Sequence, residues 1–373
     1  MKNVAGIHTT SSTNGTVDDF VHSHWKTFPD VSTEWHYFIG VVSAVICVTG
    51  VLGNALVIWI FCRHHSMRTA SNMFLVNLAV SDLGFSMFTP LMSISSFSQR
   101  WIFGNIACEM YGLGCGLFGL MSINTMAAIA GDRYYAILHP LKTASYMTRK
   151  RALFILLIVW IWSTAWAIPP VLDWGAYILE AFQTSCTFDF LTRTPGNQSF
   201  VVCLYIGGFF VPLTVIVVSY LKLCVYLKRH TQFMARTPMQ SSRNSRARST
   251  RVEIRVARVT MTIVALFVLS WSPYAIVALI AQFGPLEYVS PYVAEFLVII
   301  AKSSAIYNPV VYALSHPKFK VALHRKLPCL FCGVRTPNSI SRQSITTYAE
   351  EMEEKPAPFI TKRETLNCAN SEV

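Results

Sequence analysis

Residues 295–314, EFLVIIAKSSAIYNPVVYAL, form an apolar run long enough to cross a membrane as a helix. A transmembrane helix needs about 20 predominantly apolar residues, and this run has that length. Lys302 stands near its middle. An ionisable side chain at that depth costs on the order of 2.5–3.5 kcal/mol on insertion scales, so such residues usually face a bundle interior and mark a functional site. Lys302 is therefore a candidate functional residue.

Similar apolar blocks recur along the chain, which is 53% hydrophobic and only 13% charged. In lipid, only helices and closed barrels satisfy the backbone, and these blocks are too long and too continuously apolar for barrel strands. We therefore predict an all-α membrane protein with seven transmembrane helices. The blocks lie near residues 36–62, 72–97, 107–138, 152–172, 200–227, 257–283 and 289–314.

The blocks divide the chain into four parts. Residues 1–35 are a polar N-terminal segment without a cleavable signal-peptide pattern, and residues 36–314 are the seven-helix domain. Residues 315–328 alternate basic and apolar side chains at helical spacing, which predicts a short amphipathic helix on the inner membrane surface. Residues 329–373 are polar, and we expect a disordered tail.

The tail carries two further signals. Cys329 and Cys332 follow the amphipathic segment, where they are either palmitoylated or free thiols. The chain ends in SEV, a sequence that can add as a strand to a PDZ domain.

Lys and Arg are distributed unequally between the two sets of connecting loops, and basic loops are typical of the cytoplasmic side. We therefore expect an extracellular N-terminus, a cytoplasmic C-terminus and residence in the plasma membrane. The asymmetry accounts for the net charge of +12 without a nucleic-acid-binding domain, and the basic loops can contact anionic lipid. The basic residues include Lys142, Arg149, Lys150 and Arg151 after the third block, and Lys228, Arg229, Arg236, Arg243, Arg246, Arg248, Arg251 and Arg255 after the fifth.

Covalent modifications are expected on the outer side. Asn14 and Asn197 start glycosylation acceptor tripeptides, NGT and NQS. Cys108 opens the third block and Cys186 lies in the 173–199 loop, both facing the oxidising side, so we expect a disulfide between them. It would hold this loop over the bundle.

Several short motifs occur in order along the blocks, and together they resemble the rhodopsin class of G-protein-coupled receptors. A single DRY tripeptide would be weak evidence, but the ordered set is specific. The motifs are GN at 53–54, LAVSDL at 78–83, GDRYYAI at 131–137, LSWSPY at 269–274 and NPVVY at 308–312.

The resemblance assigns the residues at the cytoplasmic ends of the helices to activation and G-protein coupling. Asp132, Arg133 and Tyr134 would be the third-helix motif, in which Asp132 partly neutralises Arg133. Glu253, eighteen residues before Trp271, would pair with Arg133 in the inactive state. The alternative is that Glu253 is solvated within a basic segment.

A second group of activation residues is expected within the membrane. Pro273 and Pro309 each remove a backbone donor, which weakens a helix and provides a hinge. Asp82 and Asn308 suit a water-filled polar network, and Tyr312 completes the seventh-helix motif. Activation would then be an outward movement of the sixth helix.

Lys302 identifies the subgroup that the chain resembles. It lies six residues before Asn308, the spacing of the lysine that binds retinal as a Schiff base in opsins. The neutral form of a lysine amine can attack an aldehyde and form such a linkage. The resemblance places Tyr111, Gly119, Tyr205, Phe209, Trp271 and Tyr274 around the retinal.

Three residues compete for the counterion of a protonated Schiff base. Tyr111 occupies the position of the glutamate found in vertebrate visual pigments, but a phenol with an ordinary pKa near 10 is a poor anion. Glu180, six residues before Cys186, occupies the alternative family position, and we favour it. Glu295 is the remaining rival, two turns and roughly 10 Å from Lys302.

Tyr111 with Glu180 is the arrangement of invertebrate-type and melanopsin-like opsins, and His316, Pro317 and Lys318 resemble the Gq-coupled group. The resemblance implies a bistable pigment in which light converts 11-cis-retinal to all-trans-retinal. It also implies a Gq-class G protein, arrestin and a receptor kinase as partners, and residence in a photoreceptor membrane. Ser270 and Glu295 depart from the family pattern.

Two alternatives stay open. The chain could be a retinal photoisomerase of the same fold, or a receptor for a diffusible ligand in which Lys302 is structural. The intact DRY and HPK motifs and the basic third inner loop favour signalling. We find no metal cluster, phosphate loop or hydrolytic triad, and we predict a receptor and not an enzyme.

Overall fold

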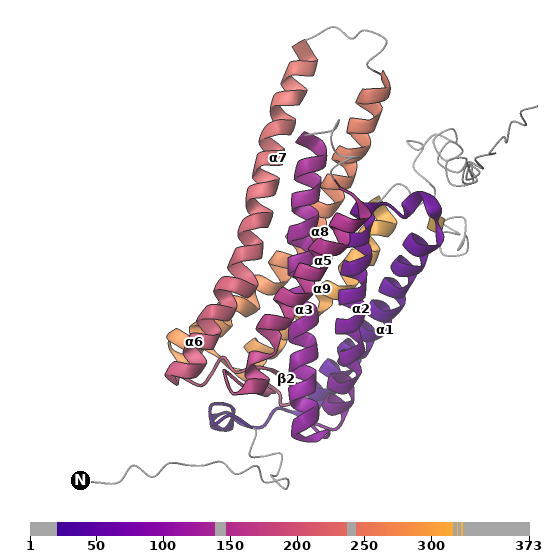
Figure 1. Cartoon of the computed structure of the whole chain (residues 1–373). Helices are drawn as coiled ribbons and strands as arrows, with labels where there is room; N and C mark the ends of the chain where they lie inside the picture. The colour runs from indigo at the N-terminus through magenta and orange to yellow at the C-terminus, as the bar shows by residue number, and fades with distance from the viewer. Residues whose placement is uncertain (1–20, 139–146, 237–243, 316–318, 320–321, 324–373) are drawn as a thin grey trace, which may run out of the picture.

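The computed structural model describes residues 21–138, 147–236, 244–315, 319 and 322–323, and for 66, 230–236 and 244–253 it describes only the backbone. Figure 1 shows the helices running side by side as one elongated bundle. The main helices are α1 Thr33–Arg63, α2 Ala70–Phe97, α3 Gly104–Leu138, α5 Arg149–Ala167, α6 Pro195–Leu204, α7 Val211–Arg236, α8 Asn244–Phe283 and α9 Pro291–Ser315. A π-helix, η5 Tyr205–Phe210, joins α6 to α7, and short 3₁₀ helices occur at η2 Trp25–Thr27, η3 His65–Met67, η4 Pro169–Leu172 and η7 Leu286–Tyr288.

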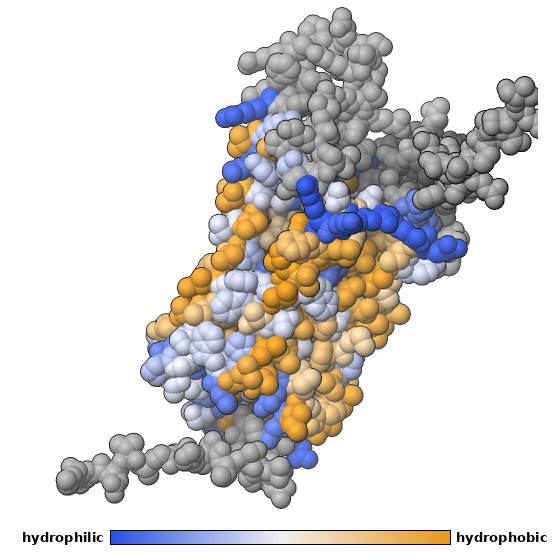
Figure 2. All heavy atoms as spheres, viewed as in Figure 1, coloured by the Kyte–Doolittle hydropathy of each residue, from blue (hydrophilic) through white to orange (hydrophobic). Residues whose placement is uncertain are grey.

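Seven spans in the described part of the chain are long and apolar enough to cross a membrane, which confirms the predicted fold class. Their outward-facing side chains are apolar, as a lipid environment requires and water would penalise. On α1, for example, Val41, Val45, Val48 and Leu52 are all exposed. Figure 2 shows apolar residues along the side of the bundle and hydrophilic residues gathered toward its ends.

Prolines account for two of the helix boundaries that differ from the predicted blocks. The fourth span ends at Ala167 because Pro169 and Pro170 cannot continue the hydrogen bonding of an α-helix, and the chain turns into η4. The fifth span begins at Pro195, five residues earlier than predicted. Proline suits the first position of a helix, and Thr194 Oγ1 caps this one by accepting from the Asn197 amide.

The 173–199 loop contains a β-hairpin that the sequence analysis did not predict. Its strands are β1 Tyr177–Glu180 and β2 Ser185–Phe188, paired antiparallel with Glu180 opposite Ser185. Both strands are too short to show a clear alternation of polar and apolar residues. Figure 1 places β2 at the end of the bundle where α6 begins, which we call the hairpin end.

A disulfide between Cys108 at the start of α3 and Cys186 on β2 holds the hairpin to the bundle, as expected from sequence. The base of the hairpin is held separately, because Tyr177 Oη donates to the Ala167 carbonyl at 2.7 Å. The hairpin therefore lies as a fixed lid over the helices. The lid carries Glu180 as the last residue of β1.

Candidate functional site

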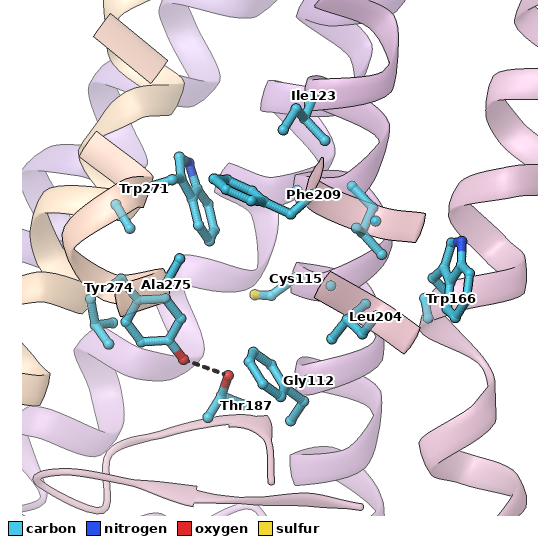
Figure 3. Close-up of a pocket in the computed structure, with 18 of the residues that line it drawn as sticks. Gly112, Cys115, Ile123, Trp166, Thr187, Leu204, Phe209, Trp271, Tyr274 and Ala275 are labelled. Carbon is cyan, nitrogen blue, oxygen red and sulfur yellow. Dashed lines mark hydrogen bonds between the residues drawn. The ribbon is translucent and has the colours of Figure 1, made fainter. Parts of the chain in front are cut away.

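A cavity lies beneath the hairpin, between the helices. Small-molecule sites are mostly apolar with a few placed polar groups. This one matches, since aromatic and aliphatic side chains dominate a wall that includes one amine, Lys302, and one carboxyl group, Glu180. In Figure 3, Trp271 and Phe209 lie at one side of the cavity and Tyr274 and Thr187 at the other.

Lys302 projects into this cavity from α9 and is only 6% exposed. Its Nζ lies 5.2 Å from the centroid of the Tyr111 ring and 5.6 Å from that of Phe85. Among the described residues it has no hydrogen bond and no ion pair, the only salt bridge there being Arg133–Asp132. The amine is thus desolvated and not bound to a carboxylate, which leaves its nitrogen available to an aldehyde.

Glu180, the last residue of β1, is 2% exposed and faces the same cavity. Its Oε1 accepts from Tyr274 Oη at 2.7 Å, and its Oε2 accepts a longer bond from Ser185 Oγ at 3.5 Å. Burial raises its pKa to about 6, although the charge of Lys302 and the bonds from Tyr274 and Ser185 oppose the rise. Glu180 is therefore held where it can be charged when a cation lies opposite.

The Tyr274 hydroxyl joins the hairpin to α8. Because this hydroxyl donates to Glu180, the 2.9 Å contact with Thr187 Oγ1 uses the Thr187 proton (Figure 3). Tyr274 also packs edge-on against Trp271, one turn away on the same helix. The Glu180 carboxyl group is thus connected through Tyr274 to Trp271, and both of these aromatic residues belong to α8.

The two rivals of Glu180 are placed differently from expectation. Tyr111 does not line the cavity but is fully buried beside Lys302. Glu295 is also fully buried, and its Oε2 accepts from the Phe182 amide at 3.4 Å. It therefore contacts the hairpin turn and does not line the cavity.

The remaining predicted cavity residues, Gly119, Tyr205, Phe209 and Trp271, all line it. Trp271 Nε1 donates to Ser304 Oγ at 3.0 Å, which fixes the indole against α9. A Cβ on Gly119 would lie 3.6 Å from the Trp271 ring, so the glycine leaves room for an apolar ligand beside it. A large apolar molecule that ends in an aldehyde fits this cavity, because the wall is mostly apolar and Lys302 supplies an amine.

Sequence reasoning missed other lining residues because each looks like an ordinary packing residue in sequence. The hairpin contributes some of them, and they could be found only by knowing that the loop folds back over the cavity. The missed residues include Phe85, Cys115, Gly116, Trp166, Tyr177, Thr187, Phe188, Phe200 and Ala275.

At the end opposite the hairpin, Arg133 and Asp132 form a buried salt bridge of 2.5 Å. Ser71 Oγ on α2 also donates to Asp132 at 3.2 Å. Glu253 lies on α8, but its side chain is outside the described residues. The Lys222 ammonium lies 5.7 Å from the centroid of the Tyr134 ring.

Between the two ends, Asp82 links three helices. Its two carboxyl oxygens accept from Ser122 Oγ on α3 and from Asn308 Nδ2 on α9. Pro309 follows within α9, and Tyr312 is buried against Phe61 and Phe319. These residues form a polar and aromatic column below the cavity.

The NQS tripeptide is not an accessible acceptor in this fold. Asn197 is buried in the first turn of α6, and its Nδ2 donates to the Asp189 and Thr192 carbonyls at 2.8 and 2.7 Å. A glycan would replace one of the two hydrogens on that nitrogen, so at least one of these bonds would be lost. The buried position therefore disfavours the modification, and glycosylation of Asn197 stays a prediction. Asn14, His316, Pro317, Lys318, Cys329 and Cys332 lie outside the described residues.

Of the expected amphipathic segment, only Phe319, Ala322 and Leu323 are described. They are helical and buried, and Phe319 packs against Phe61 of α1. The remainder of 315–328 beyond Ser315 lies outside the described residues.

Comparison with known proteins agrees with this geometry. Residues 53–312 match the model of the seven-transmembrane receptor (rhodopsin) family. A Gq-coupled rhodopsin of Mizuhopecten yessoensis is 49% identical over 85% of this chain, which spans 65% of that relative's length. A rhodopsin of Enteroctopus dofleini is 44% identical over 85% of this chain and 70% of its own. The crystal structure of squid rhodopsin superposes with a TM-score of 0.82 at 39% identity, covering 91% of this chain and 97% of that one.

The position of Glu180 predicts a pH dependence of the ligand-free protein. Its pKa is 4.5 ordinarily and about 6 here, so the folded state binds this proton more tightly than the unfolded state. The resulting stabilisation is complete below pH 4.5 and is lost as pH rises to about 6. Glu180→Gln should therefore gain stability relative to wild type across this window, by on the order of 2 kcal/mol.

The stability difference between Glu180→Gln and wild type can be measured as the free energy of unfolding of both proteins in detergent at several pH values. A difference between the two that stays constant with pH, or that shrinks as pH rises, would contradict the burial of an ionisable Glu180.

Proposed function

This chain belongs to the rhodopsin family of seven-transmembrane receptors, and we propose that it is a light-sensing receptor that binds retinal through a Schiff base on Lys302. One observation carries the proposal. Lys302 stands in an apolar cavity without an ion-pair partner among the described residues, and Glu180 faces the same cavity. When bound through a protonated linkage, retinal would supply visible absorption and a double bond that light isomerises.

The residues around the cavity would each have a defined part. Lys302 supplies the amine, and Glu180 balances the positive charge that a protonated linkage carries. Tyr274 and Ser185 donate hydrogen bonds that favour the charged form of Glu180. The apolar wall excludes water, which strengthens the pairing of these charges and protects the linkage from hydrolysis.

We further propose that 11-cis-retinal is bound in the dark and that all-trans-retinal stays attached after light, giving a bistable pigment. A change in ligand shape would press on Trp271, which packs against Tyr274, Phe267 and Phe85. Pro273 lies between Trp271 and Tyr274 in α8 and removes one backbone donor. The helix can therefore bend there and move its far end outward.

That movement would expose a surface at the end opposite the hairpin, where a G protein binds. The Arg133–Asp132 pair and Glu253 are placed to respond to it, and His316, Pro317 and Lys318 would add to the contact surface. The name of the Mizuhopecten relative supports a Gq-class partner. We infer that the hairpin end and Asn14 are extracellular. Arrestin and a receptor kinase would then act on the opposite side of the membrane. On that side, Cys329 and Cys332 are candidate palmitoylation sites, and the C-terminus is a candidate ligand for a PDZ domain.

The linkage to Lys302 predicts a visible absorption band. Protein expressed with 11-cis-retinal should show such a band, and light should change it. Lys302→Ala should remove the band, because no other amine lines the cavity within the described residues. Lys222→Ala, at an exposed residue of α7 that does not line the cavity, is the matched control and should keep the band. A visible band that persists in Lys302→Ala would contradict the proposed linkage to Lys302.

The counterion assignment predicts a spectral difference between two carboxyl variants. Glu180→Gln should move the visible band toward the ultraviolet, because the linkage loses its proton when the opposing charge is gone. Glu295→Gln should keep the visible band, since Glu295 contacts the hairpin turn and not the cavity. If only Glu295→Gln produces the shift, Glu180 is not the counterion.

Gq coupling predicts the second messenger. Cells that express the pigment should release calcium within seconds of a light pulse, and cyclic AMP should not fall. The Lys302→Ala variant in the same assay controls for light effects on the cells. Lowered cyclic AMP without calcium release would assign a different G protein, and a normal pigment with neither response would favour an isomerase.

A further inference from the structure

The turn of the hairpin, residues 181–184, is held to the helices by a carboxyl group that the proposed light reaction does not use. The strands of the hairpin are attached elsewhere, by the disulfide at Cys186, by the Tyr177 hydrogen bond at its base and by the contacts of Tyr274 Oη with both strands. At the turn itself, the Phe182 amide donates to Glu295 Oε2 on α9 at 3.4 Å. Glu295 is fully buried, and so is Phe182, at 2% exposure.

The turn needs such an attachment because its backbone is strained. Ala181 has φ +43° and Gln183 has φ +60°, a left-handed conformation that residues with a Cβ rarely adopt. Within the turn, the Gln183 amide donates back to the Glu180 carbonyl at 2.7 Å. Strained conformations persist when the surroundings over-determine them, and they cluster at functional sites.

The surroundings of Phe182 supply this constraint. Its ring packs edge-on against Tyr292 on α9 at 5.3 Å and lies 5.5 Å from the His36 ring on α1. Glu295 is one turn from Tyr292 on α9, so the same helix holds both the backbone and the side chain of Phe182. Glu180 immediately precedes this turn, and any relaxation of the turn would displace its carboxyl group.

Charge counting indicates how Glu295 is protonated. Glu180, Glu295 and Lys302 are buried and interact electrostatically, with Tyr111 nearby and His36 on the far side of Phe182. Two neighbouring carboxylates opposite one cation cannot both ionise cheaply. Glu295 has one long hydrogen bond, and its Oε1 has no partner among the described residues, whereas Glu180 accepts two. The charge therefore belongs on Glu180, and Glu295 is neutral.

We propose that Glu295 is a positioning residue, a neutral acceptor that holds the 181–184 turn through the Phe182 amide and thereby fixes the Glu180 carboxylate at the cavity. This inference rests on the proposed function, since it assigns Glu180 the charge opposite Lys302. It explains why a buried carboxyl group stands near the retinal site without lining it. The feature that matters is the reach of the side chain and not its charge.

Two substitutions separate reach from charge. Glu295→Gln keeps the length and an acceptor oxygen but cannot ionise. Glu295→Asp keeps the carboxyl group but is one methylene shorter, so it cannot reach the Phe182 amide without moving the turn. Glu287→Asp, on an exposed side chain at the same end of the bundle, is the matched control.

The readouts are the pH at which the visible band converts to the ultraviolet form and the rate at which hydroxylamine bleaches the pigment in the dark. Glu295→Asp should lower the conversion midpoint by about one pH unit, a tenfold change in proton affinity, and should speed bleaching about tenfold. Glu295→Gln and Glu287→Asp should stay within about twofold of wild type in bleaching rate and keep its midpoint. Loss of pigment in Glu295→Asp alone is the stronger form of the same result.

Any other pattern overturns the proposal. A shift in Glu295→Gln with a wild-type Glu295→Asp would mean that Glu295 acts through its charge. Wild-type behaviour of both would mean that the Phe182 contact does not position Glu180, and loss of pigment in both would mean that Glu295 is needed for more than reach. A wild-type protein without a visible band would instead contradict the proposed retinal function.

Discussion

The burial of one amine in an apolar cavity is the constraint on which the rest of the structure depends. A lysine at that depth is costly on insertion scales, and among the described residues Lys302 has no hydrogen bond or ion pair to offset the cost. The cavity around it is lined by aromatic side chains from four of the seven spans and closed by the hairpin. Such a site suits a ligand that is largely apolar and ends in an aldehyde.

The hairpin provides the one carboxyl group that lines the cavity among the described residues, that of Glu180. Its two strands are short, and its position comes from attachments at three places, to α3 by the disulfide, to the end of α5 by Tyr177 and to α9 by Glu295. The Tyr274 hydroxyl then connects this lid to α8, beside Trp271 and Pro273. The hairpin, the Glu180 carboxyl group and α8, the helix proposed to move, are thus connected through Tyr274.

The sequence predicted the features that depend on length, composition and motif spacing. The seven spans, the disulfide partners and the lysine beside Trp271, Tyr205 and Phe209 are all present in the structure. Those features are readable because a membrane span has a simple length rule and because the motifs mark the register of each helix. The comparisons confirm the family that the motifs indicated.

The features that the sequence did not predict depend on tertiary contacts. The hairpin is too short for its periodicity to be recognised, and the buried state of Asn197 follows from carbonyls of the preceding loop. Tyr111 was expected in the cavity wall, but α3 turns its ring toward Trp101 and Phe88 beside the amine. The sequence predicted that Glu295 lies two helical turns from Lys302. Its contact with Phe182 could not be predicted, because it depends on how the hairpin folds over the helices.

The central claim is that Lys302 is the residue that carries the ligand. Borohydride reduction of the illuminated pigment would fix a Schiff base as a stable secondary amine, and mass spectrometry of its peptides would locate it. We predict a retinyl adduct on Lys302 and on no other lysine. An adduct on a different residue, or a pigment that yields no covalent adduct, would contradict the account.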